Sequence, residues 1–413
     1  MALIVAKFGG TSVADIERIE SAADKVAREV EAGHKVVVVV SAMSGVTNTL
    51  VEYCGEISPM HDVREYDTVV SSGEQITAGL MAMALQKRGV SARSWLGWQI
   101  PILTDNVHGK ARIENIDTEE IRKRLDAGEV AVIPGFQGVT EKNRVATLGR
   151  GGSDTSAVAM AAALKADRCD IYTDVSGVYT ADPRIVPMAR KIHKISYEEM
   201  LELASLGSKV LQTRSVEMGA KNAVPIQVLS SFAEDVGSAR KGTLVTTEDQ
   251  ILEQELVSGI AHNNDEAKIT VVGVEDIPGA AASLFAPLAK AAINVDMIVQ
   301  NISTEGRTDM TFTVPRAELD LAVKTLKGDI GVSYRDIVVN DNLAKISIVG
   351  IGMKSHAGVA NTMFRTLADK NINIHVISTS EIKISVLIDA DYTELAVRSL
   401  HAAYGLDEST EIT

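Results

Sequence analysis

Short apolar runs alternate with helical segments over residues 1–245. Leu3–Phe8 and Lys35–Ser41 are apolar without alternation, as in strands that are covered on both faces. Between them, Asp15–Gly33 carries apolar residues at helical spacing and ends at a glycine, a residue that commonly follows a helix. This pattern predicts an α/β domain with a mostly parallel sheet sandwiched by helices. Further strands are predicted at Val130–Phe136, Arg168–Val175 and Pro225–Ser230, and further helices at Glu74–Arg88, Thr118–Ala127, Thr155–Lys165 and Tyr197–Leu206.

The rest of the chain contains an internal repeat. Residues 246–262 are polar and acidic, and we expect them to link the two parts. Beyond them, the stretch that starts at Glu266 matches the one that starts at Leu343, and "LAVKTL" (321–326) matches "LAVRSL" (395–400). Each copy has the pattern strand, glycine turn, helix, strand, strand, helix. This predicts two small α+β modules, at 263–340 and 341–413.

Composition excludes several classes of protein. With 413 residues, of which 46% are apolar and 23% charged, the chain is expected to form two or three soluble globular domains. Its 41 basic and 55 acidic residues give a net charge of −14, so no basic surface for nucleic acid is expected. Cys54 and Cys169 are too few for a disulfide framework or a zinc site. Neither a signal peptide nor a membrane span is predicted, and the expected location is the cytoplasm.

Glycine turns follow several of the predicted strands. "KFGGTSV" (Lys7–Val13) places a lysine at a strand end beside two glycines, whose N–H groups can approach a ligand. "GRGGSDTSA" (Gly149–Ala157) puts an arginine and two glycines at a helix start, which suits an anion. "SAMSGVTN" (Ser41–Asn48), "VVSSGEQ" (Val69–Gln75) and "TDVSGVYTADPR" (Thr173–Arg184) are expected to have the same form, a strand end and then a turn.

Each of these turns, taken alone, has an ordinary structural explanation. Glu74, for example, could merely complement the dipole of its helix. Together, however, the turns are expected to bring four cations, Lys7, Arg150, Arg184 and Lys209, to one edge of the sheet. No Ser-His-Asp or metal-ligand spacing accompanies them. The pattern therefore favours electrostatic stabilisation of a phosphoryl group over covalent catalysis by the protein.

These five motifs, in this order and followed by two repeated modules, resemble the bacterial aspartate kinases, which combine an amino-acid-kinase fold with tandem ACT domains. The resemblance covers nearly the whole chain. It implies transfer of the γ-phosphoryl group of ATP to the β-carboxylate of L-aspartate, which gives 4-phospho-L-aspartate. It also implies feedback inhibition by end products of lysine, threonine and methionine synthesis.

The resemblance also assigns residues to this reaction. Lys7 would neutralise charge on the transferring group, while Asp154 would position the reacting groups. Arg150 would pair with the α-carboxylate of aspartate, and Glu74 with its α-ammonium group. The residues implied to bind aspartate are Ser41, Thr47, Glu74, Arg150, Gly151, Gly152 and Ser153; those implied to bind ATP are Lys7, Phe8, Gly9, Gly10, Ser12, Thr173, Asp174, Tyr179, Asp182, Arg184 and Lys209.

The β-carboxylate of aspartate is already ionised at neutral pH, so we expect no general base. Since the sequence offers no cluster of carboxylates, Mg²⁺ is expected to be held mainly by the nucleotide and water. Two departures from the family pattern, Ser72 in place of threonine and Ser176 in place of aspartate, leave the detailed nucleotide affinity open.

The two modules are expected to bind amino-acid effectors, lysine or threonine or both. Gly279 and Gly358 occupy matching turns, each before a helix whose N-terminus suits a carboxylate. Modules that only dimerise remain an alternative. We expect a homodimer or a larger assembly through these modules, and a separate regulatory subunit stays open. The expected effector-binding residues are Asp276, Gly279, Ala280, Ala281, Asn294, Gln300, Met353, His356, Gly358, Val359, Asn373, Ser380 and Glu381.

Two other functions remain open at this stage. One is a kinase of the same fold that acts on glutamate, acetylglutamate, carbamate or a nucleoside monophosphate. The other is an amino-acid sensor without catalytic activity. The combination of Glu74 with Arg150, as a clamp for a zwitterion, argues against the first. Intact Lys7 and Asp154 argue against the second.

Overall fold

The structure is a computed structural model of the chain, and it describes residues 1–207, 210–239, 241–251, 256–301, 306–328 and 331–407. The chain forms two compact units that are not continuous in sequence. The first comprises Met1–Val178, Lys191–Ser205 and Lys209–Glu253, and the second comprises the remainder. The last segment of the first unit ends at Glu253, eight residues beyond the expected boundary at residue 245, and Tyr179–Arg190 groups with the second unit.

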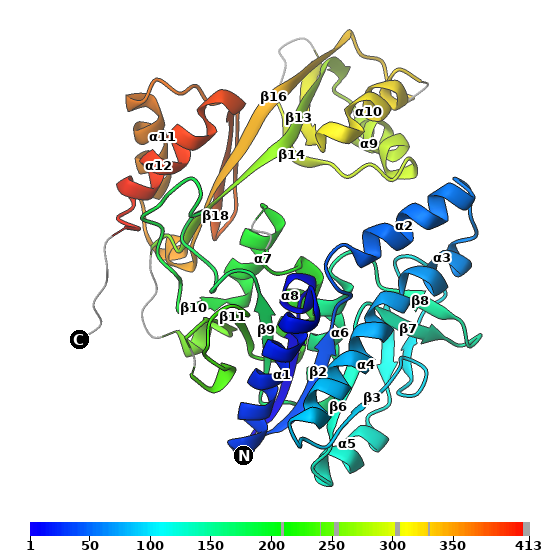
Figure 1. The fold of residues 1–413 in the computed structure, drawn as a ribbon. Helices are drawn as coiled ribbons and strands as arrows, with labels where there is room; N and C mark the ends of the chain where they lie inside the picture. The colour runs from blue at the N-terminus through cyan, green and yellow to red at the C-terminus, as the bar shows by residue number, and fades with distance from the viewer. Residues whose placement is uncertain (208–209, 240, 252–255, 302–305, 329–330, 408–413) are drawn as a thin grey trace. The chain divides into compact units, whose positions relative to one another are not determined.

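The first unit contains an eight-stranded sheet that is parallel over most of its width (Figure 1). Its strand order is β10-β12-β11-β9-β1-β2-β6-β3, and the one antiparallel pair is β11 with β12. The five predicted strands are all present, with ends that differ by one or two residues, so the predicted α/β fold is confirmed. The strands of this sheet are β1 (Leu3–Phe8), β2 (Lys35–Val40), β3 (Ala92–Ser94), β6 (Val130–Pro134), β9 (Arg168–Thr173), β10 (Lys194–Ser196), β11 (Ile226–Ser230) and β12 (Thr243–Thr246).

Helices cover both faces of this sheet, and the side chains of β1 point alternately to one face and the other. Ala6 and Phe8 belong to a buried cluster formed with α1 and α4, which Figure 1 shows in front of the strands. Lys7 points to the opposite face, where it meets α6. The small residues of α6 allow it to be buried on almost every side. The helices of this unit are α1 (Ile16–Glu31), α2 (Val46–Ile57), α3 (Val63–Val70), α4 (Ser72–Lys87), α5 (Glu119–Asp126), α6 (Gly152–Leu164), α7 (Tyr197–Ser205) and α8 (Thr213–Asn222).

The segment before Glu74 differs from the prediction. Val69 and Val70 were expected to end a strand, but they form the last turn of α3. Asp62 caps this helix by accepting a hydrogen bond from the N–H of Arg64 at 2.8 Å. A pair of valines is too short a run to distinguish a strand from a helix. Glu74 still lies in the first turn of a helix, as the sequence indicates.

A second, four-stranded sheet in this unit was not predicted. Its order is β5-β4-β7-β8, and each strand has only three or four residues, too few to give an alternating pattern. Its last strand leads directly into the glycine loop before α6. The small sheet therefore carries one flank of the candidate site. Its strands are β4 (Ile102–Thr104), β5 (Ile113–Ile116), β7 (Gln137–Thr140) and β8 (Val145–Thr147).

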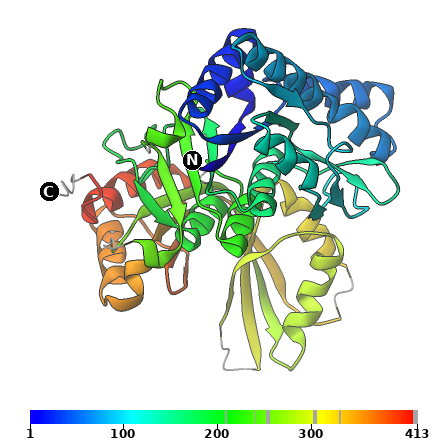
Figure 2. The same cartoon turned by 90° about the horizontal axis from the view of Figure 1, so that it is seen from below.

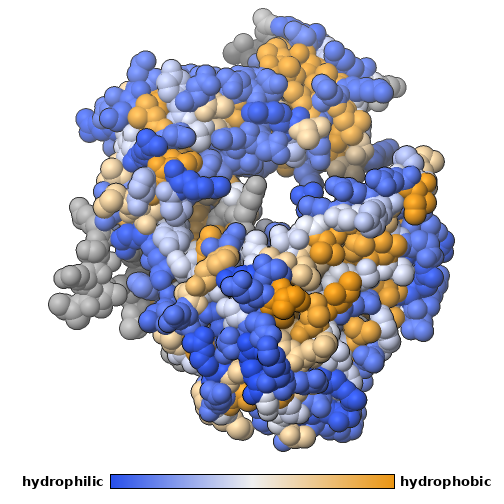
Figure 3. Space-filling model, in the orientation of Figure 1, coloured by the Kyte–Doolittle hydropathy of each residue, from blue (hydrophilic) through white to orange (hydrophobic). Residues whose placement is uncertain are grey.

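Apolar side chains also gather on the outer surface of α4 (Figure 3). Ile76 and Met83 are 57% and 65% exposed there, although the opposite side of the helix is buried against α1. Because α4 is apolar on both sides, its hydrophobic pattern alone does not identify the buried face. Within the described part of the chain, no helix combines the length and the apolar character needed to cross a membrane.

The second unit is built on one six-stranded antiparallel sheet, in the order β14-β15-β13-β16-β18-β17. The predicted repeat is confirmed, because each half contains strand, helix, two strands and a helix in the same order. Figures 1 and 2 show α9 and α10 at one end of the sheet and α11 and α12 at the other. The elements are β13 (Gly259–Glu275), α9 (Ala280–Lys290), β14 (Asp296–Gln300), β15 (Arg307–Val314), α10 (Leu319–Leu326), β16 (Asp336–Val349), α11 (Val359–Asp369), β17 (Val376–Thr379), β18 (Lys383–Asp389) and α12 (Thr393–Ala403).

The two modules are joined through their central strands, β13 and β16, which pair along most of their length. β13 begins at Gly259, so the last residues of the predicted linker lie in a strand. Gly259–Asn263 pairs with Lys345–Val349 of the second module, whereas Lys268–Val272 pairs with Asp336–Asn340. A cut between residues 340 and 341 would therefore divide β16.

Tyr179–Arg190 packs within the second unit. Thr180 accepts a hydrogen bond from the N–H of Ile260 at 2.7 Å, and its hydroxyl lies 2.9 Å from Nε2 of His401. Ala181 and Val186 belong to the core around α11 and α12. The sequence shows only that Pro183 interrupts the segment, so this packing could not be predicted.

Candidate active site

The candidate site lies where the parallel strands of the first unit end. Lys7, the residue before the end of β1, places its Nζ 2.6 Å from Oδ1 of Asp154 in the first turn of α6. Their side chains are only 9% and 11% exposed. Two residues that are 147 positions apart in sequence thus form a nearly buried ion pair. Such a pair supplies a cation beside a carboxylate in a place that excludes most water.

The diglycine turn after β1 is fixed by hydrogen bonds to the neighbouring strand. The N–H of Gly9 donates to the carbonyl of Tyr172 at 3.1 Å, and Oγ of Ser12 donates to the same carbonyl at 3.2 Å. A Cβ atom on Gly9 would lie 3.3 Å from Nζ of Lys7. The side chain of Phe8 is fully buried and stacks on the Tyr172 ring, with centroids 4.7 Å apart. Phe8 can therefore line a ligand site only through its backbone.

The glycine loop before α6 carries four of the predicted aspartate-binding residues, Arg150, Gly151, Gly152 and Ser153. Gly151 caps α6 with φ of 70°, and a Cβ atom there would meet the side chain of Gln212 at 1.9 Å, so only glycine fits. Arg150 precedes it and is exposed, whereas Ser153 is buried. The loop thus places an exposed guanidinium group beside the helix N-terminus that carries Asp154.

Glu74 occupies a buried position beside the end of β2. Its Oε1 accepts a hydrogen bond from the N–H of Ala42 at 3.1 Å, while Oε2 is buried without a hydrogen-bond partner among the described residues. Burial raises the pKa of this carboxyl from 4.5 to about 7, although the bond from Ala42 lowers it. A buried oxygen without a donor fits a cationic ligand. Ser41 follows β2 directly, and Thr47 lies in the first turn of α2.

The predicted ATP-binding residues beyond the turn after β1 fall into three groups. Thr173 and Asp174 lie at the end of β9, beside β1, where Thr173 accepts a hydrogen bond from the N–H of Ser231 at 2.8 Å. Tyr179, Asp182 and Arg184 belong to the second unit, where Arg184 donates to both carboxylate oxygens of Asp182. Their role in ATP binding stays a prediction. Lys209 lies outside the described residues.

The predicted effector residues lie in matching places in the two modules. Gly279 and Gly358 cap α9 and α11 in the left-handed conformation, with φ of 93° and 99°. A Cβ atom on either would meet nothing within 4 Å. Asn294 and Asn373 lie in the loops just before β14 and β17. Asp276, Ala281, Gln300, Ser380 and Glu381 are exposed, Ala280 and Val359 are buried, and Met353 is half-buried. His356 is also exposed, with its Nδ1 2.8 Å from the carbonyl of Gly352.

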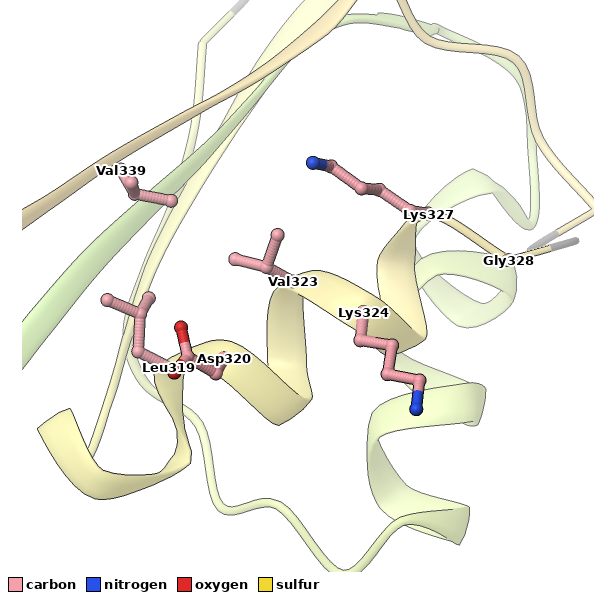
Figure 4. Close-up of a pocket in the computed structure, with 7 residues that line it drawn as sticks. All are labelled: Leu319, Asp320, Val323, Lys324, Lys327, Gly328 and Val339. Atoms are coloured by element: carbon pink, nitrogen blue, oxygen red, sulfur yellow. The ribbon is translucent and has the colours of Figure 1, made fainter.

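A groove of about 480 Å³ lies between α10 and the first half of β16 in the second unit (Figure 4). Val323 and Val339 face its interior, and Lys327 extends over it, while Lys324 points away. None of the predicted catalytic or effector residues lines it. The residues that line this groove are Leu319, Asp320, Val323, Lys324, Lys327, Gly328 and Val339.

Polar residues that were not predicted from the sequence support the glycine loop. Asp67, on α3, is fully buried and contacts Thr147, the last residue before that loop. Arg214 donates to the carbonyl of Leu148 at 2.9 Å. No motif signals these residues, because each contributes a single polar group to a segment without glycine. No group of three or more His, Cys, Asp or Glu residues in the described ranges is arranged to hold a metal ion.

Comparisons with protein families match two parts of the chain. A family model described as the amino acid kinase family matches residues 2–230. A model described as an ACT domain matches residues 269–329 and 346–404. The first match contains all the candidate residues from Lys7 to Lys209, and the other two contain the repeated modules.

Whole proteins similar to this chain include an aspartate kinase from Stutzerimonas stutzeri, which is 55% identical over 409 residues, 98% of both chains. An aspartokinase from Pseudomonas aeruginosa is 56% identical over 410 residues, again 98% of both chains. Among solved structures, Escherichia coli aspartokinase III in complex with aspartate and ADP has a TM-score of 0.80 and 27% identity, and the match covers 97% of this chain and 99% of that one. The complex of that enzyme with lysine and aspartate has a TM-score of 0.76, with the same identity and coverage.

Proposed function

Because the chain belongs to the amino acid kinase family, and within it to the aspartate kinases, we propose that Lys7, Asp154, Glu74 and Arg150 perform its phosphoryl transfer. The reaction moves the γ-phosphoryl group of ATP to the β-carboxylate of L-aspartate. The observation that supports this assignment is the ion pair of Lys7 with Asp154, set at the end of β1 beside the diglycine turn. The test is an assay of ATP-dependent hydroxamate formation, run with aspartate, with glutamate and without an acceptor. Turnover is expected only in the reaction that contains aspartate.

In this reaction a β-carboxylate oxygen attacks the γ-phosphorus, and the bond from that phosphorus to the β,γ-bridging oxygen breaks. Both reactants are anionic, so their charge repulsion is the main obstacle. Nζ of Lys7 offsets the charge on the transferring group, and Gly10 offers its N–H group to the phosphates, because the N–H of Gly9 already donates to the carbonyl of Tyr172. Asp154 holds the ammonium group of Lys7 in place before ATP binds. The carboxylate nucleophile is already ionised, so no group on the protein needs to accept a proton.

Mg²⁺ fits this site as an ion that binds together with the nucleotide. The carboxylates of the described residues around Lys7 are isolated and form no cluster, and Asp154 is already paired with Lys7. We therefore propose that ATP phosphates and water hold the ion, with Asp174 as the protein group available at the end of β9. When bound, Mg²⁺ supplies further positive charge to the phosphates.

Aspartate is held as a zwitterion between two charged groups. Glu74 receives the α-ammonium group, because its buried Oε2 has no donor among the described residues. Arg150 receives the α-carboxylate, aided by the N–H groups at the start of α6. Ser41, Thr47 and Ser153 supply hydroxyl groups around the substrate. This arrangement leaves the β-carboxylate free to face the γ-phosphorus.

Replacing Arg150 by lysine tests this clamp. Arg150→Lys keeps the charge but removes the planar pair of donors that matches a carboxylate. We expect the KM for aspartate to rise about tenfold, equivalent to ~1.4 kcal/mol, while the KM for ATP changes little. Steady-state kinetics with each substrate varied in turn measures both values. The control is Arg122→Lys, which changes an exposed arginine near the other end of α6. A rise in the KM for ATP alone would assign Arg150 to the nucleotide.

We propose that lysine, threonine or both inhibit this enzyme by binding at the helix N-termini after Gly279 and Gly358. The open space beside both glycines leaves room for a ligand carboxylate. Glu381, exposed in the turn after β17, is available to a lysine ammonium group. Binding of effector and of substrate would then be coupled reciprocally, typically by about 1–3 kcal/mol.

Gly358→Asp tests the effector site of the second module. The added carboxylate would repel an effector carboxylate. Because φ of Gly358 is 99°, aspartate there also strains the backbone, so the melting temperature of the variant is measured beside its activity. We expect at least a tenfold loss of inhibitor potency with a nearly unchanged kcat in the absence of inhibitor. Titration of lysine and threonine, singly and together, measures it. Gly279→Asp makes the same change at the matching position of the first module. Unchanged inhibition in both variants would exclude these turns.

We also propose that the enzyme is a cytoplasmic homodimer or larger assembly. The sheet of the second unit ends in two edge strands, β14 and β17, and an edge strand can pair with a strand of another chain. Paired ACT modules would extend this sheet across two copies. A separate copy of the regulatory half is the alternative partner. Sedimentation of the purified chain with and without effectors distinguishes a self-assembling enzyme from one that needs a second subunit.

A further inference from the structure

Asp67 is a fully buried carboxylate that receives three hydrogen bonds from two other segments of the first unit. Its Oδ2 accepts from Nδ1 of His108 at 2.8 Å and from the N–H of Gly109 at 3.0 Å. Its Oδ1 accepts from the hydroxyl of Thr147 at 2.5 Å. None of these residues belongs to the proposed aspartate or ATP contacts. A buried carboxylate is retained at a cost in desolvation, which three donors offset.

The three donors lie on the segments that flank the glycine loop. Thr147 is the last residue of β8, and only Leu148 and Gly149 separate it from Arg150. The carbonyl of Thr147 accepts a hydrogen bond from the N–H of Ala111 at 2.9 Å. Arg214 then joins the carbonyls of Ala111 and Leu148, at 2.8 and 2.9 Å. The start of the loop is therefore held from both sides.

Asp67 also stands near the other half of the clamp. It lies on α3, which continues through Ser71 into α4, where Glu74 is in the first turn. The carboxylate of Asp67 thus connects α3, which leads to Glu74, with β8, which leads to Arg150. The separation between Glu74 and Arg150 must match the separation of the two charged groups of an α-amino acid.

We infer that Asp67 is a positioning residue for aspartate, because it fixes the loop of Arg150 relative to the helix of Glu74 through its bond with Thr147. This inference rests on the proposed function of those two residues. Displacement of a binding group by about 1 Å can cost two orders of magnitude in rate. The hydroxyl of Thr147 is the contact that carries the coupling, since it is the nearest to the loop in sequence.

Thr147→Val is the first test, because valine keeps the shape of threonine and removes only the hydroxyl. We expect the KM for aspartate to rise about tenfold, the KM for ATP to stay within twofold, and the melting temperature to fall by a few degrees. The matched control is Thr104→Val, on β4 of the same small sheet. Thr104 is fully buried, and its hydroxyl has no hydrogen-bond partner in the described part of the chain. This control should leave both KM values unchanged.

His108 provides a second test that does not alter the strand. His108→Asn retains an N–H group near the place of Nδ1, and His108→Leu removes it. We expect the KM for aspartate to rise in the leucine variant and to stay close to the wild-type value in the asparagine variant. If both variants lose stability equally while neither changes the KM for aspartate, Asp67 has only a structural role and the inference is wrong.

A double-mutant cycle separates this inference from the proposed function. If Asp67 acts through the Arg150 loop, the effects of Thr147→Val and Arg150→Lys on the KM for aspartate should be less than multiplicative. Fully multiplicative effects would mean that Thr147 acts independently of Arg150, which overturns the inference. If Arg150→Lys leaves the KM for aspartate unchanged, the clamp itself fails. If Arg150→Lys raises that KM and Thr147→Val does not, only the positioning role fails.

Discussion

Replacing Lys7 by alanine should lower kcat by more than a hundredfold, while the KM for each substrate changes far less. In the proposed role, the ammonium group of Lys7 faces charge that develops as the phosphoryl group transfers, so its contribution would be larger in the transition state than in the ground state. Removal of one such electrostatic donor from an enzyme typically costs about 3 kcal/mol or more. The small exposure of the Lys7 side chain, 9%, strengthens the effect, because little water is present to replace the charge.

Lys7→Ala also leaves Asp154 buried without its partner, so the stability of the variant must be measured beside its activity. Breaking a buried ion pair by removing one member commonly costs about 3–5 kcal/mol of stability. Lys25→Met is the matched control, because Lys25 is likewise buried and donates to the carbonyl of Asp235 at 3.2 Å. The control should lower the melting temperature and retain kcat. A folded Lys7→Ala enzyme that turns over at a near-normal rate would contradict the role of Lys7.

The parts of the fold that the sequence predicts well are those with long, uninterrupted patterns. β1, β2 and α1 follow from unbroken apolar runs and from helical spacing, and the repeat of the second part follows from matching segments. The four-stranded sheet was missed because its strands are too short for any pattern. Val69 and Val70 were misassigned for a related reason, since two apolar residues fit a helix end and a strand end equally well.

Some residues of the candidate site can likewise be predicted from the sequence, and others cannot. The glycine turns identify Lys7, Arg150 and Asp154, because close approach to a ligand restricts the sequence to glycine. The interaction between Lys7 and Asp154 is not visible in the sequence, since it joins distant positions across the sheet. Asp67 gives no signal at all. Its role depends on which segments the fold brings to it, and one aspartate in a helix has no distinctive spacing.

Replacing Glu74 by glutamine should raise the KM for aspartate on the order of a hundredfold. The substrate ammonium group would then be buried beside a neutral amide, and an unpaired buried charge costs about 3 kcal/mol or more. Wild-type kcat/KM for aspartate should also fall about fivefold between pH 7 and pH 6, because burial raises the pKa of Glu74 to about 7 and the ionised fraction of its carboxyl drops from about one half to about one tenth. The variant should lack this pH dependence.

The raised pKa of Glu74 also predicts how stability depends on pH. Activity is expected to rise with pH, whereas the free energy of unfolding is expected to fall. The folded protein holds the proton on Glu74 up to about pH 7, whereas the unfolded chain releases it near pH 4.5. Burial of this carboxyl therefore costs stability progressively as the pH rises from 4.5 to 7, and of order 3 kcal/mol above pH 7. Glu74→Gln avoids the cost, so at pH 8 it should melt at a higher temperature than the wild type while it binds aspartate more weakly. Glu199→Gln is the control, because Glu199 is also buried but accepts hydrogen bonds from both the N–H and the hydroxyl of Ser196. A Glu74→Gln enzyme with lower stability and unchanged KM would show that Glu74 supports the fold and does not bind the substrate.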